Sequence, residues 1–211
     1  GGLLGPMTSL AAVAGCIVQI DFRTLEAQPI IFPATHKLVV CDAGIKNLLI
    51  HSKYKLRHDQ CREALRVAKT IALEIQSLRD VNPVEMQKIA GHMNEYVFRT
   101  AMHVCKENQR VRESAEALGQ GDIAAFGANM NLSQLSSKQS IENSTKEIDH
   151  LMQIAKGLPG FTGSRLSGYG FGGLTVHLVV AEQAEAFKNS LGEADSSKTF
   201  IVELSAGALV I

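Results

Sequence analysis

A glycine-rich loop at residues 167–173 is the segment of this sequence whose composition points most directly to chemistry. Four of the six residues after Ser167 are glycine, and glycine lets a backbone adopt positive φ angles and come close to a ligand. Successive N–H groups in such a loop can surround an anion. A tight connection between two packed strands has the same composition, so an anion-binding loop and a structural turn both stay open. The glycines are Gly168, Gly170, Gly172 and Gly173.

The loop does not match the two common nucleotide-binding loops. A dinucleotide-binding G-x-G-x-x-G sequence opens a helix, whereas the apolar run after this loop, residues 174–180, predicts a strand. A P-loop continues with Gly-Lys-Ser or Gly-Lys-Thr, and this loop does not. The sequence therefore excludes both signatures here.

Tyr54 is the second candidate for contact with a ligand. Ser52 is a natural N-cap for a helix that begins here, which would place Tyr54 in the first helical turn. A phenol at that position can hydrogen-bond a polar ligand or stack on the face of a sugar. An ordinary tyrosine at a packing interface is the alternative.

The histidines and cysteines are spaced in ways that favour structural roles. No pair of the histidines considered has a metal-ligand spacing such as H-E-x-x-H, the cysteines form no C-x-x-C pair, and the sequence has no G-x-S-x-G elbow. We therefore predict no metal site and free, partly buried thiols. The residues are His92, His103, His177, Cys16, Cys41, Cys61 and Cys105.

The elements that must position these residues follow from the spacing of apolar side chains. Short strand-like runs come first, helices with apolar residues three or four apart follow, and the last third alternates between strand and helix. This order predicts an α+β fold, with helices packed on one side of a mostly antiparallel sheet. The predicted strands are 16–20, 30–32, 38–40, 164–166, 174–180, 199–204 and 208–211, and the predicted helices are 53–78, 93–118, 122–130, 144–155 and 181–191.

Helix ends are predicted from capping residues. Gly119 and Gly121 should end the second helix, and Asp122 should cap the third. Ser144 should cap the fourth, with Glu147 three residues later as in a capping box.

Composition narrows the class of protein. The chain has 211 residues, 45% hydrophobic and 20% charged, which suits a globular domain with a real core. Its 21 basic residues equal its 21 acidic ones, which argues against a protein that binds nucleic acid by neutralising phosphates. We see no apolar run of about 18 residues and no secretory signal, so we expect a cytoplasmic protein with no membrane contact.

The order of short motifs resembles the galactokinases, which belong to the GHMP kinases. Each motif alone is weak, but together, in order and at the family spacing, they are specific to galactokinases rather than to other GHMP kinases. The similar segments are Gly5–Ser9 (family G-I-M-D-Q), Asp21–Glu26 (D-C-R-S-L-E), Ser52–Cys61 (S-x-Y-N-x-R-R-x-x-C), Leu78–Val81 (L-R-D-V), His103–Asp122 (H-V-x-x-E-x-x-R-V, then A-L and G-D), Ser164–Gly173 (S-R-M-T-G-G-G-F-G-G) and Ser205–Ala208 (S-x-G-A).

The resemblance implies ATP-dependent phosphorylation of the C1 hydroxyl of galactose, with ATP and Mg²⁺ as cofactors. It implies that Gly5 offers its backbone N–H to the sugar, that Tyr54 hydrogen-bonds a sugar hydroxyl and that the glycine loop borders the site. It also implies that residues 36–211 form a GHMP kinase C-terminal domain. Residues 1–35 would then be a remnant of the N-terminal domain with connecting strands.

Two substitutions depart from the family pattern. Thr8 stands where the family has the aspartate that orients or deprotonates the attacking hydroxyl, and a threonine hydroxyl is no general base near neutral pH. The alternative for Thr8 is a structural one, as the cap of a helix start. Tyr169 replaces a glycine of the loop.

Two family segments, the sugar-binding G-E-H-x-D-Y and the ATP-cradling P-x-G-x-G-L-S-S-S-A, are expected upstream of residue 1. We therefore expect the chain to hold roughly the C-terminal half of a kinase.

Three functions remain open. The chain is either a galactokinase-like portion that does not catalyse alone, a non-catalytic sugar-sensing or interaction module, or one part of a kinase assembled with a separate N-terminal half. Thr8 favours the first two equally, and the absent sugar-binding segment counts against the second.

Overall fold

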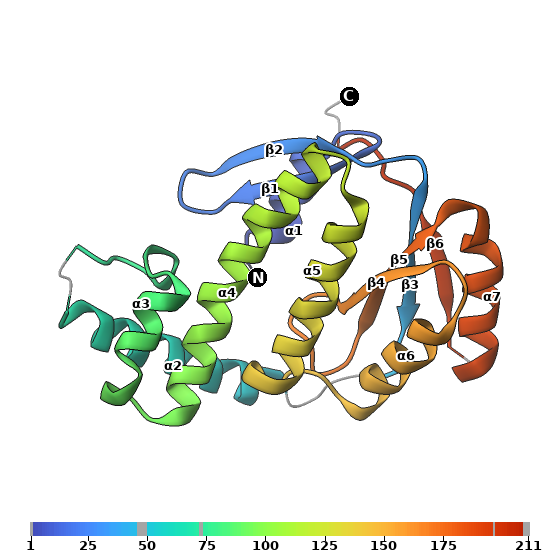
Figure 1. The fold of residues 1–211 in the computed structure, drawn as a ribbon. Coiled ribbons are helices and arrows are strands. Elements are labelled where there is room, and N and C mark those ends of the chain that lie inside the picture. The colour runs from blue at the N-terminus through green and yellow to red at the C-terminus, as the bar shows by residue number, and fades with distance from the viewer. Residues whose placement is uncertain (1, 46–49, 72–73, 196, 209–211) are drawn as a thin grey trace.

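The computed structural model describes residues 2–45, 50–71, 74–195 and 197–208. A four-stranded sheet and a two-stranded hairpin are joined by a helical layer (Figure 1). The strands are β1 (Cys16–Asp21), β2 (Glu26–Ile31), β3 (His36–Asp42), β4 (Phe161–Leu166), β5 (Leu174–Val180) and β6 (Thr199–Val202). The α-helices are α1 (Leu4–Ala11), α2 (Ile50–Lys69), α3 (Pro83–Lys88), α4 (Glu95–Gly119), α5 (Ile123–Ser136), α6 (Lys146–Gly157) and α7 (Ala184–Asp195).

The larger sheet has the order β4-β5-β3-β6, and its neighbouring strands are antiparallel. In the central strand β3, Val39 lies opposite His177 of β5 and Ile201 of β6. Because side chains alternate along a strand, Val39 and Cys41 point to the same face, and both are fully buried. The predicted α+β fold with a mostly antiparallel sheet is confirmed.

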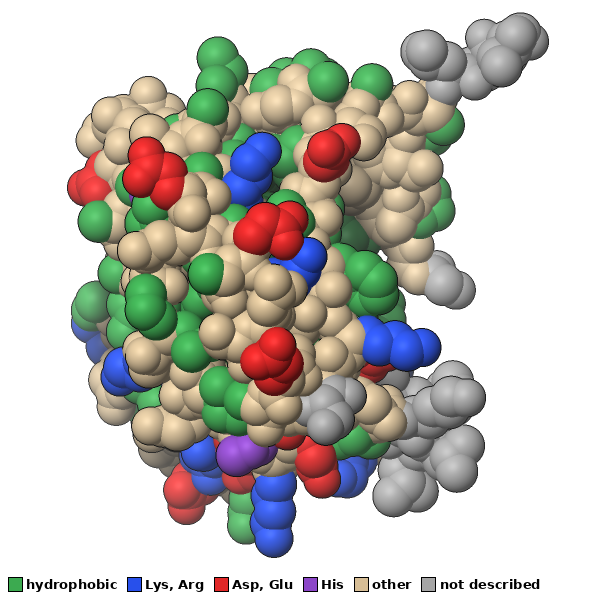
Figure 2. All heavy atoms as spheres, turned by 90° about the vertical axis from the view of Figure 1, so that its right-hand side faces the viewer, with side chains coloured by type: hydrophobic (Ala, Val, Ile, Leu, Met, Phe, Trp, Pro, Cys, Tyr) green, Lys and Arg blue, Asp and Glu red, His purple; other side chains and the backbone are tan. Residues whose placement is uncertain are grey.

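Helices α6 and α7 cover that face of the sheet (Figure 1). Ile148 and Leu151 of α6 and Phe187 of α7 are fully buried against the strands. Figure 2 looks onto this side of the molecule, where acidic and basic side chains are interspersed with apolar ones. In the described parts of the chain, no helix is both long and apolar enough to cross a membrane.

A second core lies in the helical layer between α2, α3 and α4. Small side chains of α2 and α4, Ala64, Ala68 and Ala101, are almost completely buried, which lets the two helices approach closely. Met86 of α3 fills the third side.

Helix α5 lies along β4, at the edge of the sheet. The side chains of Asn131 and Gln134 accept hydrogen bonds from the backbone N–H groups of Ser164 and Leu166, both at 2.9 Å. These side chains take the place of a further strand, so the edge is covered rather than left open to another chain.

The described ends of the chain meet. The backbone N–H groups of Gly207 and Ala208 donate to the carbonyl oxygens of Ala12 and Ser9, both at 2.7 Å. A helix leaves its last carbonyls without partners inside the helix, so residues 207–208 complete the end of α1.

Several predicted boundaries need correction. The helix predicted over 53–78 begins at Ile50, so Ser52 is not its N-cap, and it ends at Lys69, where the Thr70 hydroxyl donates to the Val67 carbonyl oxygen at 2.7 Å. Leu78 instead belongs to a short 3₁₀ turn, Leu78–Asp80, and is buried in the second core. Its apolar character reflects burial and not a continuing helix.

The fourth helix is capped one residue later than predicted. Thr145 accepts a hydrogen bond from the N–H of Ile148 at 3.3 Å, while the Ser144 hydroxyl donates to Asp149 at 2.7 Å. Asp122 caps α5 as predicted, with a 2.9 Å bond from the N–H of Ala125.

The third predicted helix, 122–130, is α5, which continues to Ser136 and is followed by a π-helical turn, Ser137–Ile141. The helix predicted over 181–191 starts as a 3₁₀ turn and becomes α7 only at Ala184. The strand predicted over 199–204 ends at Val202. Residues 209–211 of the last predicted strand lie outside the described residues, and Ala208 is not in a strand.

Candidate functional site

Three segments that are far apart in the sequence meet at the side chain of Tyr169. Its ring lies edge-on to Tyr54 of α2, with 5.0 Å between the ring centroids and 73° between their planes. Its hydroxyl oxygen lies 3.1 Å from the position that a Cβ atom on Gly2 would occupy. The start of the chain, the first part of α2 and the glycine loop therefore form one surface.

The glycine loop has the backbone that its composition predicts. Gly168, Gly170, Gly172 and Gly173 all have positive φ angles, between 70° and 124°. A Cβ atom on Gly170 would collide with the carbonyl oxygen of Asn143. Glycine is therefore required at this position both for its backbone angle and for space.

Asn143 fixes the loop through two hydrogen bonds that bracket Gly170. Its side-chain amide donates to the carbonyl oxygen of Tyr169 at 3.0 Å, and its own carbonyl oxygen accepts from the N–H of Phe171 at 2.6 Å. Nothing in the sequence marked Asn143 as part of this site, because its partners lie far along the chain.

Glu142, the residue before Asn143, ties the loop to the helical layer. Its carboxylate accepts hydrogen bonds from Arg99 of α4 at 2.8 Å and Arg57 of α2 at 3.1 Å. The Arg99 hydrogen bond, followed by the charges of both arginines, lowers the pKa of Glu142. Lys53 of α2 adds a cation–π contact, with its Nζ atom 5.3 Å from the centroid of the Phe171 ring. Helix α2 and the loop are thus held together on both sides of Tyr54.

Helix α1 carries the other two predicted site residues, Gly5 and Thr8, and both are exposed. Gly5 lies in the first turn, where backbone N–H groups have no partner within the helix. The alternative that Thr8 caps this helix is wrong, because α1 begins at Leu4 and the Thr8 hydroxyl donates to the Leu4 carbonyl oxygen at 2.8 Å.

Two of the histidines considered in the sequence, His177 and His103, lie beside hydroxyl groups away from the Tyr169 surface. His177 is fully buried, its Nε2 atom lies 2.8 Å from the Thr175 hydroxyl, and burial lowers its pKa to about 4. His103 lies with its Nδ1 atom 2.8 Å from the Ser136 hydroxyl, and burial lowers its pKa as well. Neither is part of the Tyr169 surface.

The cysteines are free thiols. Burial raises the pKa values of Cys41 and Cys105 to about 11 and raises that of Cys61, so these thiols are poorly nucleophilic. Among the described residues, no three His, Cys, Asp or Glu side chains gather as a metal site would need.

Two motifs that the sequence analysis matched separately pair with each other. Asp21, the last residue of β1, accepts two hydrogen bonds from Arg79 at 2.7 and 2.6 Å, and Arg23 pairs with Asp80 at 2.8 Å. The Arg79 hydrogen bonds are the largest cause that holds the pKa of Asp21 well below its usual range. The signal was present in the sequence, since each motif holds one Asp and one Arg, but only the fold shows that they pair across motifs.

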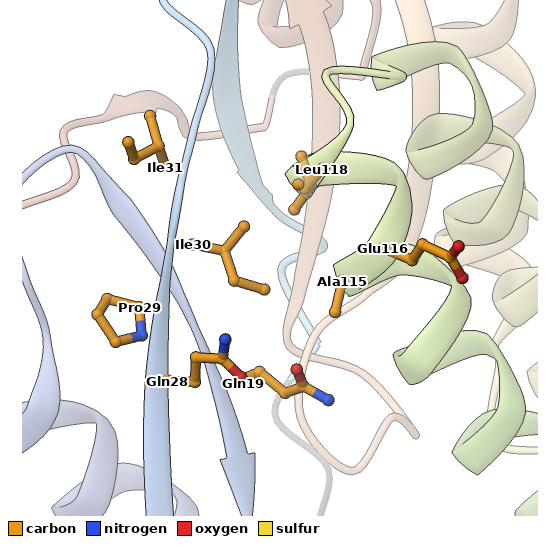
Figure 3. A pocket seen from close by; sticks show the side chains of 9 residues that line it. Gln19, Gln28, Pro29, Ile30, Ile31, Ala115, Glu116 and Leu118 are labelled. Carbon is orange, nitrogen blue, oxygen red and sulfur yellow. The ribbon is translucent and has the colours of Figure 1, made fainter.

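A hollow of about 500 Å³ lies elsewhere, between β2 and the C-terminal end of α4. Figure 3 shows Ile30 pointing from β2 toward Ala115 and Leu118 of α4, with Gln19 and Gln28 below them. None of the predicted site residues lines this hollow. Of the predicted residues, Tyr54 and the glycine loop lie together at Tyr169, while Gly5 and Thr8 lie on α1.

Comparison with known proteins identifies relatives of this chain. Residues 114–196 match the family described as "GHMP kinases C terminal". The chain is 37% identical to a galactokinase of Chloroflexus aurantiacus over 88% of this chain and 48% of that protein. It is 35% identical to a galactokinase of Bos taurus over 100% of this chain and 53% of that protein. The chain thus spans about half the length of the curated relatives it matches.

Solved structures agree with these relatives. The crystal structure of Lactococcus lactis galactokinase complexed with galactose matches with a TM-score of 0.85 and 25% identity, over 94% of this chain and 53% of that one. The crystal structure of L. major mevalonate kinase in complex with R-mevalonate matches with a TM-score of 0.59 and 20% identity, over 92% and 50% of the two chains. The second match shows a shared fold only.

Proposed function

Because this chain belongs to the GHMP kinases and is related to galactokinases, we propose that it is a galactokinase-like portion that contributes a sugar-facing surface. We further propose that these 211 residues alone do not transfer a phosphoryl group. The sugar class is proposed from the galactokinase relatives and from the galactose complex of the Lactococcus lactis protein.

The convergence of three segments on Tyr169 carries the proposal. A ligand-binding surface needs side chains from separate elements held in fixed positions. Tyr54 has 47% of its surface exposed, and it is held beside the glycine loop by contacts on both sides. It therefore offers a phenol and an accessible ring to a sugar.

Gly5 supplies the second proposed contact. Its N–H is free of partners inside α1, and its helix is fixed at the other end by residues 207–208. Gly5 therefore offers a positioned donor to a sugar hydroxyl, as the resemblance implies.

Thr8 supplies the argument against catalysis. Phosphoryl transfer to a hydroxyl is helped by a residue that accepts the hydroxyl proton or orients the nucleophile, and general base catalysis contributes about 10²–10⁴ in rate. The Thr8 hydroxyl is a donor to the Leu4 carbonyl oxygen and does not accept protons near neutral pH. In this chain we assign it no catalytic role.

ATP and Mg²⁺ are implied by the family, and when bound they would supply the phosphoryl group and the charge that stabilises its transfer. Among the described residues we find no cluster of three metal-ligating side chains. The glycine loop has its N–H of Phe171 already bonded to Asn143. We therefore assign no residue of this chain to either group, and we derive no step through them.

The test uses the 211-residue chain. We expect no galactose-dependent release of ADP above background, and weak galactose binding in an NMR titration. Tyr54→Ala should weaken that binding severalfold, while Tyr96→Ala, which removes another exposed tyrosine on α4, should not. Turnover above background would overturn the inactive assignment, and equal binding by Tyr54→Ala would remove Tyr54 from the site.

A second candidate, an interaction module or one part of an assembled kinase, is favoured by exposed apolar side chains. Helix α1 has no buried residue. Large apolar side chains are exposed along the first part of the chain: Leu3, Leu4, Leu10, Val13, Phe22, Leu25 and Ile31. The separation of residues 1–35 from 36–211 as two units and the cytoplasmic location remain predictions.

A further inference from the structure

Tyr169 stands where the resembling family motif has glycine, and the backbone accepts it without strain. Its neighbours Gly168 and Gly170 have φ angles of 70° and 74°, whereas Tyr169 is not among the residues with positive φ. A side chain at this position therefore costs the loop nothing in backbone conformation. What it changes is the space outside the loop.

The Tyr169 side chain contacts one of the proposed sugar contacts, Tyr54, and extends toward the start of the chain. Its ring packs against Tyr54, and its hydroxyl reaches Gly2, three residues before Gly5. The carbonyl oxygen of Tyr169 is held by Asn143 at 3.0 Å, so the base of the side chain is fixed while 55% of the residue remains exposed. The ring thus lies across the surface on a rigid support.

We propose that Tyr169 is a specificity-determining residue that restricts access to Tyr54 and limits the size of sugar this surface admits. This inference rests on the proposed function. A sugar that stacks on Tyr54 must displace or fit beneath the Tyr169 ring, and a larger sugar must displace it further. The glycine of the family motif would leave the same space open.

The expected effect follows from the strength of the aromatic pair. Separating an edge-on pair of rings reduces affinity roughly 2- to 10-fold. Removing the Tyr169 ring should therefore raise the affinity for galactose by about that factor. The gain should be larger for lactose, a galactose-containing disaccharide, because more of the ring's space is then needed.

The experiment is an NMR titration of the full chain with galactose and with lactose. Tyr169→Gly removes the ring and restores the motif residue, Tyr169→Phe keeps the ring, and Tyr96→Ala is the matched control on another surface. We expect Tyr169→Gly to bind both sugars more tightly, lactose most, and the other two variants to match the original chain. Melting temperatures of the variants show that each one is folded.

The outcomes separate this inference from the proposed function. If the original chain binds galactose and Tyr169→Gly binds it equally or more weakly, the proposal that Tyr169 restricts access to Tyr54 is wrong. The proposed sugar-binding surface is then still supported. An equal gain for both sugars would overturn the size limit. If only Tyr169→Gly binds, both proposals are supported. If neither the original chain nor any variant binds either sugar, the proposed sugar-binding surface is wrong, and so is the proposed role of Tyr169.

Discussion

His177 is a basic side chain placed inside an apolar core, between β5 and α7. Its ring lies 5.7 Å from that of Phe187, and its Nδ1 atom has no hydrogen-bond partner in the described part of the chain. A charged imidazolium would be costly in this position, which is why burial lowers the pKa of His177 to about 4 from its usual value of about 6.5 in exposed peptides.

Stability should consequently fall in mild acid. Above pH 6.5 His177 is neutral in both the folded and unfolded chain, but between pH 6.5 and 4 only the unfolded chain binds the proton, so unfolding is favoured as the pH drops. From pH 7.5 to 4.5 this costs about 2–3 kcal/mol. Urea unfolding at the two pH values should show that His177→Leu loses less stability than the original chain by about this amount. Parallel losses in the two proteins would contradict the assignment.

For single residues, the sequence predicted the candidate site residues better than it predicted the contacts that those residues make. The glycines at 168, 170, 172 and 173 were identified because positive φ leaves a local signature in residue type. The contact of Tyr54 with Tyr169 and the two hydrogen bonds that Asn143 makes with the loop leave no such signature in the sequence. They depend on how α2 and the 142–143 segment pack against the loop.

The β1–β2 hairpin is joined to the second core by charge. Asp21 and Arg23 lie at the turn of the hairpin, and Arg79 and Asp80 lie in the 3₁₀ turn, so each acidic residue pairs with the basic residue of the other element. Reciprocal pairs of this kind fix the hairpin against the helical layer at two points. All four side chains keep partial exposure, so salt should weaken the link.

A charge exchange tests this link. Asp21→Arg alone should lower the melting temperature, because it places two arginines together, and adding Arg79→Asp should recover most of the loss. Asp59→Arg is the matched control, since Asp59 pairs with Arg62 within the single helix α2 and should have a smaller effect. If the double variant melted no higher than Asp21→Arg, the two residues would not be coupled in this way.

Element boundaries were predictable where local and tertiary signals agree. The strand predicted over 174–180 is β5 itself, and the helix predicted over 93–118 differs from α4 by two residues at its start and one at its end. The helix predicted over 53–78 was too long at its C-terminal end, because the apolar residue Leu78 packs in the second core and does not belong to α2. Ser144 and Thr145 are both good caps, and only the packing of α6 selects between them.

At the scale of the whole molecule, apolar exposure is uneven. In β3, Val39 and Cys41 are fully buried, whereas Ile31 of β2 and Leu10 of α1 are 77% and 72% exposed. Apolar side chains exposed in a group mark contact surfaces more often than single ones do. This surface is the one that further polypeptide would cover if the chain acts as part of an assembled kinase.

Lysine substitutions test that surface. Leu10→Lys and Ile31→Lys should change the melting temperature of the chain little, because surface substitutions usually alter stability by less than about 0.5 kcal/mol. They should weaken association with the part of the Chloroflexus aurantiacus galactokinase that this chain does not match, measured by analytical ultracentrifugation. Val84→Lys, at an exposed position of α3, is the control and should leave association unchanged. Unchanged association in all three variants would argue against a covering partner here.

The hydrogen bonds from Gly207 and Ala208 to the end of α1 have a consequence for biosynthesis. The ribosome makes these two residues about 200 residues after α1, which at 5–20 residues per second is roughly 10–40 s later. During that interval the carbonyl groups at the end of α1 lack the hydrogen bonds that Gly207 and Ala208 donate to them in the folded chain. Gly5 and Thr8 therefore reach their final setting only after nearly all of the described chain has been translated.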